Sequence, residues 1–313
     1  MENEAPQQDS YVHKTVLLHE SIDGLAIEAG DTYLDGTLGS AGHALYAATV
    51  QPTICIVGLD RDPGAIARAT KRLEQAKKNG TNIFLINENY RNLDLALDSI
   101  GTALGKEHPS VNRIMLDLGL SSDQFETSGR GFSFQKNEPL LMTFKENLTE
   151  EDLTAREIVN TWDEENIADI IYGYGEETYA RKIAKGIVAA RAIRPIETTF
   201  DLVEAIKSST PGRYHKGRIH PATKTFQALR ITVNDEIGAL KEGLAKGFER
   251  LAPGGRMAVI SFHSIEDRIV KHFYKEKAGA KIITKKPLTP SETEIKENPR
   301  SRSAKLRIIQ KVN

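Results

Sequence analysis

Short apolar runs alternate with helix-like segments between residues 32 and 119. Apolar runs of this length predict buried strands. The four runs are 32–34, 54–59, 83–86 and 114–116. Strands that alternate with helices are typical of βαβ units, so this part of the chain predicts an α/β fold with a mostly parallel sheet.

The segment after the second run carries clear helix signals. Asp62 suits an N-cap, Pro63 suits the first turn, and Gly80 suits the position just past the end. Apolar residues recur at helical spacing between them. These are Ile66, Ala69, Leu73 and Ala76.

The strand signal almost vanishes between Gly131 and Arg230, where helical patterns take its place. Residues 176–191 place an apolar face on one predicted helix, and residues 198–201 open another with a capping-box pattern. Residues 222–233 share a further helical face. A helical block at this point predicts an insertion after the fourth strand.

The sheet pattern returns near the end of the chain. Residues 251–256 predict a turn, and runs at 257–262 and 305–310 predict two more strands. The predicted division is a first core part at 1–127, an inserted helical domain at 128–232, and a second core part at 233–313.

Two of the predicted strands end in an aspartate followed by glycine, at Asp35-Gly36 and near Asp117-Leu118-Gly119. Glycine permits a tight turn or the close approach of a ligand. Open α/β sheets bind ligands beyond the carboxyl ends of their strands. The pattern therefore predicts a small-molecule crevice lined by carboxylates.

Asp60 ends the second predicted strand, downstream of the glycine-containing turn at 35–43. A carboxylate at that place can accept hydrogen bonds from both hydroxyls of a ribose, which favours a ligand role over a structural one. Tyr90, after the third strand, could stack on an adenine or belong to the core. The turn lacks the Gly-x-Gly-x-x-Gly fingerprint, which disfavours a nicotinamide oxidoreductase.

Asp117 lies where a carboxylate could accept a proton from an amine that is being alkylated, with Gln124 nearby as donor and acceptor. Asp117 could instead cap the following turn. His263, Ser264 and two acids suggest a hydrolase or a metal site, but no Gly-x-Ser-x-Gly elbow and no second histidine at ligand spacing accompany them. We expect no metal.

The formal net charge of −1 does not indicate a class of binding partner, but the charges are unevenly distributed along the chain. From Arg268 onward the chain has thirteen Lys or Arg against four Glu. Such a region attracts polyanions, although a solvated, disordered tail is the alternative.

The single cysteine, Cys55, excludes an intrachain disulfide and is expected to be an inert core thiol. Residues 1–10 do not resemble a signal peptide, and no segment has membrane-spanning length. These features predict a cytoplasmic protein with no membrane partner.

Five motifs together resemble one family, the bacterial 16S ribosomal RNA (cytosine-N4)-methyltransferases. The resemblance runs from residues 13–20 to residues 298–307, almost the whole chain. Its most specific stretches are 117–124, 130–134, 220–231, 261–268 and 298–307.

The resemblance implies a Rossmann-like core with an inserted helical domain, and S-adenosylmethionine as cofactor. It implies methylation of the exocyclic amine of a cytosine in the decoding region of 16S ribosomal RNA, within the small ribosomal subunit. The resemblance leaves open whether the protein forms a homodimer. Carried over position by position, the expected cofactor contacts are Ala41, Gly42, His43, Asp60, Tyr90, Asp117 and Gln124.

Two departures from the family pattern stand out, together with one difference from amino-methyltransferases in general. Ala41 replaces a glycine that usually precedes the loop histidine, and an alanine resists positive φ. The stretch 140–145 lacks two acids and an arginine that relatives commonly carry. After Asp117, Leu118-Gly119-Leu120 replaces the prolines and tyrosine found in many amino-methyltransferases.

Base stacking must therefore come from other aromatic residues, and Phe132, Phe134 and Phe262 are candidates, although each could be core. Basic residues are expected to hold the RNA backbone. These are Lys182, Lys185 and Arg191 in the insert and Arg300, Arg302, Lys305 and Arg307 in the tail. A ribosome-binding or assembly protein that lacks turnover is the alternative function.

Overall fold

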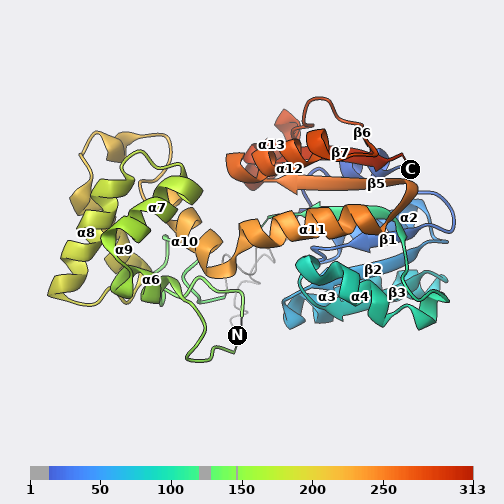
Figure 1. Cartoon of the computed structure of the whole chain (residues 1–313), viewed down its shortest axis with the longest axis horizontal. Helices are drawn as coiled ribbons and strands as arrows, with labels where there is room; N and C mark the ends of the chain where they lie inside the picture. Colours follow the sequence, from blue (N-terminus) through green and yellow to red (C-terminus); the bar gives the residue numbers. More distant parts are fainter. Residues whose placement is uncertain (1–13, 120–127, 146, 313) are drawn as a thin grey trace, which may run out of the picture.

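The computed structural model describes residues 14–119, 128–145 and 147–312 (Figure 1). Its described part holds a seven-stranded sheet in the order β3-β2-β1-β4-β5-β7-β6. The strands are β1 (Thr32–Asp35), β2 (Cys55–Asp60), β3 (Asn82–Asn87), β4 (Val111–Asp117), β5 (Leu251–Ser261), β6 (Ala280–Ile282) and β7 (Lys305–Lys311).

The first five strands in the order pair in parallel, and β7 pairs antiparallel with both β5 and β6. The prediction of a Rossmann-like, mostly parallel sheet is confirmed. β6 was not predicted, because its three residues include the exposed Lys281 and Ile282 and form no apolar run.

Helices cover both faces of the sheet. One face packs against α1 (Leu18–Leu25), α2 (Gly42–Val50) and α3 (Pro63–Lys78). The other packs against α4 (Leu93–Ser99), α11 (Glu236–Arg250) and α12 (Ser264–Glu276). Helix α13 (Glu292–Glu297) precedes β7. Short 3₁₀ turns are η1 (Tyr90–Asn92), η2 (Thr102–Leu104), η3 (Tyr214–Lys216) and η4 (Pro299–Ser303).

Five helices form a separate group that we call the helical lobe, drawn at the left of Figure 1. They are α6 (Ala155–Thr161), α7 (Glu164–Gly175), α8 (Ala180–Ile193), α9 (Thr199–Ser209) and α10 (Thr223–Asn234). The lobe has its own apolar cluster, distinct from the two clusters on the sheet. The arrowhead of β5 points toward it. The domain limits 1–127, 128–232 and 233–313 stay a prediction.

Local signals set several element ends as predicted. Asp62 caps α3 by accepting a hydrogen bond from the Gly64 N–H at 2.8 Å. Thr198 and Asp201 form the predicted capping box of α9. The helix expected over 176–191 begins only at Ala180, because Glu176 has φ 48° and ends α7 instead.

The predicted turn at 251–256 is part of β5. Opposite β4, the pairing passes from Leu251 to Arg256, so the intervening residues bulge out of the register. Gly254 has φ 78° there, a conformation that glycine adopts freely. The turn signal therefore marks an irregularity inside a strand that continues on both sides of it.

Cys55 lies half-buried in β2, and burial raises the pKa of its thiol, which suits an inert side chain. In the described part of the chain, no helix is both long and apolar enough to cross a bilayer.

Candidate functional site

A cavity opens at the carboxyl ends of the parallel strands. Strand ends contribute Gly36, Asp60, Asp117 and Phe262 to its wall, and Tyr90 follows from the turn after β3. The sequence predicted a ligand crevice at this edge of the sheet.

Backbone contacts hold the first and fourth strand ends together. The Gly36 N–H donates to the Met115 carbonyl at 2.9 Å, and the Asp117 N–H donates to Thr37 Oγ1 at 2.6 Å. A Cβ at position 36 would lie 2.5 Å from Leu116 Cδ2. Glycine is therefore needed there because the two chain segments touch.

Asp60 anchors the glycine-containing loop from the cavity wall. One carboxylate oxygen accepts from the Gly39 N–H at 2.8 Å, and the other accepts from the Asp62 N–H at 2.9 Å. Burial raises the pKa of Asp60, although these two bonds oppose that shift. Each oxygen keeps a second lone pair, so the carboxylate can still accept hydrogen bonds from ligand hydroxyls.

The loop before α2 has a positive φ at Ala41, although an alanine at this position disfavours that conformation. Ala41 has φ 60° and ψ 32°, the left-handed region that glycine occupies without strain. Gly42 packs so tightly that a Cβ would lie 1.9 Å from Thr15 Oγ1. Gly42 and His43 line the cavity, and His43 Nε2 lies 3.2 Å from the Val16 carbonyl oxygen.

Tyr90 forms a fixed aromatic wall. A Cβ at Gly243 of α11 would lie 2.5 Å from Tyr90 Cδ2, so the helix backbone packs directly on the ring. Burial raises the pKa of Tyr90, which keeps its hydroxyl protonated. The ring is thus positioned by an element that lies far away in the sequence.

Asp117 is half-buried at the end of β4. Burial is the main cause that raises the pKa of its carboxyl to about 7, and the charge of Glu266 adds to the shift. The Gly119 N–H, 3.4 Å from Oδ1, opposes it. A carboxyl with this pKa can release and accept a proton near neutral pH.

Asp35, which the sequence predicted as a second carboxylate of the crevice, is 1% exposed and does not line the cavity. Burial raises the pKa of Asp35 to about 7, and the charge of Asp117 contributes. The Tyr33 hydroxyl donates to Asp35 Oδ2 at 3.2 Å. The two aspartates therefore form one buried acidic pair at adjacent strand ends.

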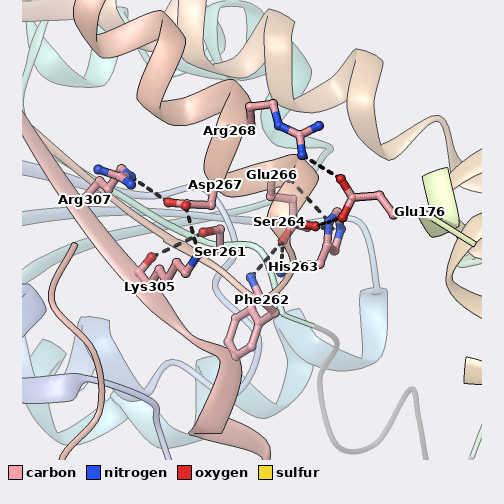
Figure 2. Close-up of polar contacts among 10 residues, drawn as sticks. All are labelled: Glu176, Ser261, Phe262, His263, Ser264, Glu266, Asp267, Arg268, Lys305 and Arg307. Atoms are coloured by element: carbon pink, nitrogen blue, oxygen red, sulfur yellow. Dashed lines mark hydrogen bonds and ion pairs between the residues drawn. The ribbon is translucent and has the colours of Figure 1, made fainter. Parts of the chain in front are cut away.

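Glu266 is a second acid that sequence reasoning missed. It lies in the first turn of α12, where its Oε2 accepts from the Phe262 N–H at 2.8 Å (Figure 2). His263 is the N-cap in the same capping box. A polar residue followed three positions later by glutamate, directly after a strand, was the available signal.

Phe262 alone of the three predicted stacking candidates lines the cavity in the described structure. A Cβ at Gly119 would lie 2.8 Å from its Cε2 and 3.4 Å from Asp117 Oδ1. The ring therefore lies beside the Asp117 carboxylate. Phe132 is buried in the helical lobe, and Phe134 stacks on His220 with ring centroids 4.4 Å apart.

The altered stretch 140–145 contributes Phe144 to the cavity wall. The Arg61 guanidinium lies 4.2 Å from the centre of the Phe144 ring, which stacks on Phe132 at 5.3 Å. Asn234 holds this stretch by accepting from the Phe144 N–H at 2.9 Å. Neither Phe144 nor Arg61 was predicted from the sequence.

Three residues beside the cavity could offer ligand atoms to a metal. Glu236, His263 and Glu266 each have one such atom, all within 4.8 Å of one another. Both Glu236 oxygens are already paired with Arg230, at 2.9 and 3.0 Å. That guanidinium supplies positive charge to the cluster, so we assign no metal here, and the expectation of none stays a prediction.

The basic tail needs a correction. Arg307 lies in β7, is only 8% exposed, and pairs with Asp267 of α12 at 2.6 Å (Figure 2). Lys305 pairs with the same carboxylate at 3.0 Å. The prediction that Arg307 holds RNA is wrong, and so is the disordered-tail alternative for this segment, because the segment is a strand inside the sheet.

The other predicted basic contacts differ in exposure. Arg191 is half-buried and donates to the Val159 carbonyl at 2.9 Å, which is a packing role. Lys182, Lys185 and Arg302 are exposed, and Arg300 lines the cavity. Gln124 lies outside the described residues.

Taken together, the cavity suits a ligand that carries hydroxyl groups and a positive centre. Asp60 offers acceptors to hydroxyls, and Asp117 and Glu266 place negative charge nearby. Tyr90 supplies an aromatic surface in the same cavity wall.

Comparisons with known proteins give a consistent result. A family model described as the MraW methylase family matches residues 10–312. A protein named ribosomal RNA small subunit methyltransferase H from Synechococcus elongatus is 45% identical over 309 residues, which cover 99% of this chain and 98% of the relative. A protein of the same name from Deinococcus deserti is 44% identical, over 97% of this chain and 95% of its own length.

Proposed function

The chain belongs to the MraW methylase family, and on this premise we propose that it methylates the N4 amine of a cytosine in the decoding region of 16S ribosomal RNA. It is a methyltransferase whose methyl donor is S-adenosylmethionine. The observation that carries the proposal is the Asp117 carboxyl, with a pKa of about 7, beside Phe262 in the cavity wall.

The cofactor fits the residues present. Asp60 would accept hydrogen bonds from the ribose hydroxyls, and Tyr90 would lie against the adenine. Gly42 and His43 would border the rest of the molecule, and Gln124 completes the proposed set, while the fully buried Ala41 would act by shaping the loop. When bound, the cofactor supplies a methyl group on a positively charged sulfur, which the acids around Asp117 would stabilise.

Methyl transfer to a cytosine amine needs help from the protein because the nitrogen lone pair is delocalised into the ring. Phe262 would hold the base, and Asp117 would accept a hydrogen bond from the amine. This orients the nitrogen for in-line attack. As the carbon–nitrogen bond formed, the methyl–sulfur bond would break and leave a neutral thioether, and Asp117 would accept the proton that the nitrogen loses.

The substrate must present its cytosine outside a base stack. Unstacking costs a few kcal/mol, and less where the base already lies in a loop. We place the reaction in the cytoplasm on the small ribosomal subunit, where that RNA is found. A homodimer remains compatible with the proposal.

The test replaces Asp117 with asparagine, which keeps the shape but cannot accept the proton. We expect Asp117→Asn to lower the rate of labelled methyl transfer to small subunits by about 10²- to 10⁴-fold. Calorimetry should still detect cofactor binding, weakened by the loss of one nearby negative charge. Asp169→Asn, at an exposed acid on α7, is the matched control. Near-normal turnover in Asp117→Asn would remove this residue from the mechanism.

Mass mapping of modified cytosines tests the substrate assignment separately. RNA from cells without this enzyme should lack one methyl group on a decoding-region cytosine, and the wild-type enzyme should restore it. An unmodified decoding region in both samples would contradict the proposed target.

A further inference from the structure

The connection between α9 and α10, residues 211–220, is a basic loop with no acidic residue in it. Arg213, Lys216 and Arg218 are all exposed, and so is Lys207 at the end of α9. No carboxylate among the described residues forms an ion pair with any of these four side chains. Their charge is therefore available to a partner.

The uncharged side chains of the loop hold it in place from inside. The Tyr214 hydroxyl donates to Glu177, a carboxylate with 0% exposure, and the Tyr214 ring lies 4.9 Å from the Tyr179 ring. His215 Nε2 lies 2.8 Å from Thr210 Oγ1. The loop is thus an ordered element whose polar and aromatic residues face inward while its cations face outward.

Two ring contacts and the chain segment 132–134 connect the end of this loop to the cavity. His220 stacks on Phe134 at 4.4 Å with an angle of 9° between the planes. Phe134 follows Phe132, which stacks on the cavity-lining Phe144 at 5.3 Å. Burial lowers the pKa of His220, and the charges of Lys207 and His215 lower it further, in line with a concentration of positive charge.

We propose that the basic loop 211–220, together with Lys207, binds the phosphate backbone of the RNA substrate and positions it for the cavity. The inference rests on the proposed function. An ordered loop that already displays several unpaired cations loses little conformational entropy when it binds, unlike a mobile basic tail. The partner class is a polyphosphate backbone, so contacts are electrostatic and independent of sequence.

The test compares two triple variants with equal charge change. The loop variant is Arg213→Gln/Lys216→Gln/Arg218→Gln. The control variant, Lys71→Gln/Lys77→Gln/Lys106→Gln, removes three exposed lysines from α3 and from the loop before β4, outside the basic C-terminal region. The probes are purified small ribosomal subunits and a transcript of their RNA, with binding measured across a range of KCl concentrations.

We expect the loop variant to bind at least tenfold more weakly at low salt. The slope of log affinity against log salt should fall by about 2, as for three lost phosphate contacts. Cofactor affinity should not change, and the control should bind like the wild type. Arg218→Gln alone, expected to lower the slope by about 0.7, replaces the triple variant if that variant unfolds at a lower temperature.

Equal affinity and slope in the loop variant and the wild type would overturn the inference, and would leave the loop to an acidic protein or another partner. Methyl transfer by the wild type to the same subunits tests the proposed function separately. If transfer occurs but the loop variant binds normally, only the inference fails. If the wild type neither binds nor methylates the RNA, both fail.

Discussion

Asp117 combines two properties that its neighbours do not share. It lines the cavity, and burial together with nearby negative charge holds its pKa at about 7. Asp35 has a similar pKa but is buried at the strand end beneath it. Asp60 has both oxygens in backbone hydrogen bonds. Of these three aspartates, Asp117 is therefore the one suited to exchange a proton with a bound substrate.

This pKa predicts a pH dependence of methyl transfer. The carboxylate must be deprotonated to accept a proton, and a raised pKa means that protonation occurs at a higher pH than usual. The kcat/KM for RNA should rise with pH below about 7 and level off above it. Rates in Asp117→Asn should lack this limb. A wild-type profile that is flat from pH 5.5 to 8.5 would contradict the assignment.

Ala41 is strained at φ 60°. A non-glycine residue in the left-handed region costs about 1 kcal/mol, so Ala41→Gly should raise the free energy of unfolding by up to that amount. Urea unfolding measures the change. Ala44→Gly, inside α2, is the control and should lower stability by about 1 kcal/mol. Equal losses in the two variants would show that Ala41 is not strained.

Strand β7 lies between β5 and the edge strand β6. It enters antiparallel and brings two cations to Asp267 of α12 (Figure 2). The ion pair with Arg307 is nearly buried, so it joins the last strand to the helix that carries Glu266 toward the cavity.

Removing the carboxylate tests this role. Asp267→Ala leaves the Arg307 guanidinium buried without a partner, so the free energy of unfolding should fall by about 3 kcal/mol. Glu297→Ala breaks the exposed Lys14–Glu297 pair, whose side chains are 53% and 55% exposed, and should cost less than about 1 kcal/mol. Denaturant midpoints measure both. A smaller loss in Asp267→Ala than in Glu297→Ala would contradict the argument.

In the described structure, both an apolar cluster of Ile231, Ile237 and Ile265 and several polar contacts join the helical lobe to the helices on the sheet. Helix α10 passes into α11 at Asp235, where φ is 46°, and Arg230 bridges that junction by pairing with Glu236. On another side, Glu176 at the end of α7 pairs with Arg268 of α12 at 2.6 Å and accepts from the Ser264 hydroxyl (Figure 2). The next residue, Glu177, accepts from Tyr214 of the basic loop, so the contacts of Glu176 lie between that loop and α12.

Loss of Glu176 should therefore affect RNA more than the cofactor. The pair is largely exposed, so Glu176→Ala should raise KM for the small subunit by roughly threefold. Cofactor affinity should be unchanged. Glu165→Ala, at an exposed position on α7, is the control. Steady-state kinetics measure KM in both variants. An unchanged KM in Glu176→Ala would contradict a role of Glu176 in RNA binding.

Local patterns were sufficient for most of the fold and part of the site. Apolar runs gave the parallel strands because strands buried on both faces need continuous apolar side chains. Asp62 and Thr198 marked helix starts because a cap needs only neighbours a few residues away. Asp60 and Asp117 could be predicted to line one cavity because the carboxyl ends of parallel strands share an edge.

The remaining features depend on residues that are distant in the chain. The contact of Arg61 with Phe144 depends on how the helical lobe packs beside the sheet. The pairing of Asp267 with Arg307 depends on the place of the last strand. Composition alone predicted an RNA-binding tail at the C-terminal region. In the structure, the last strand lies inside the sheet, and Arg307 is buried there. Sequence periodicity determines which elements form, whereas the partner of a buried charge depends on which elements pack side by side.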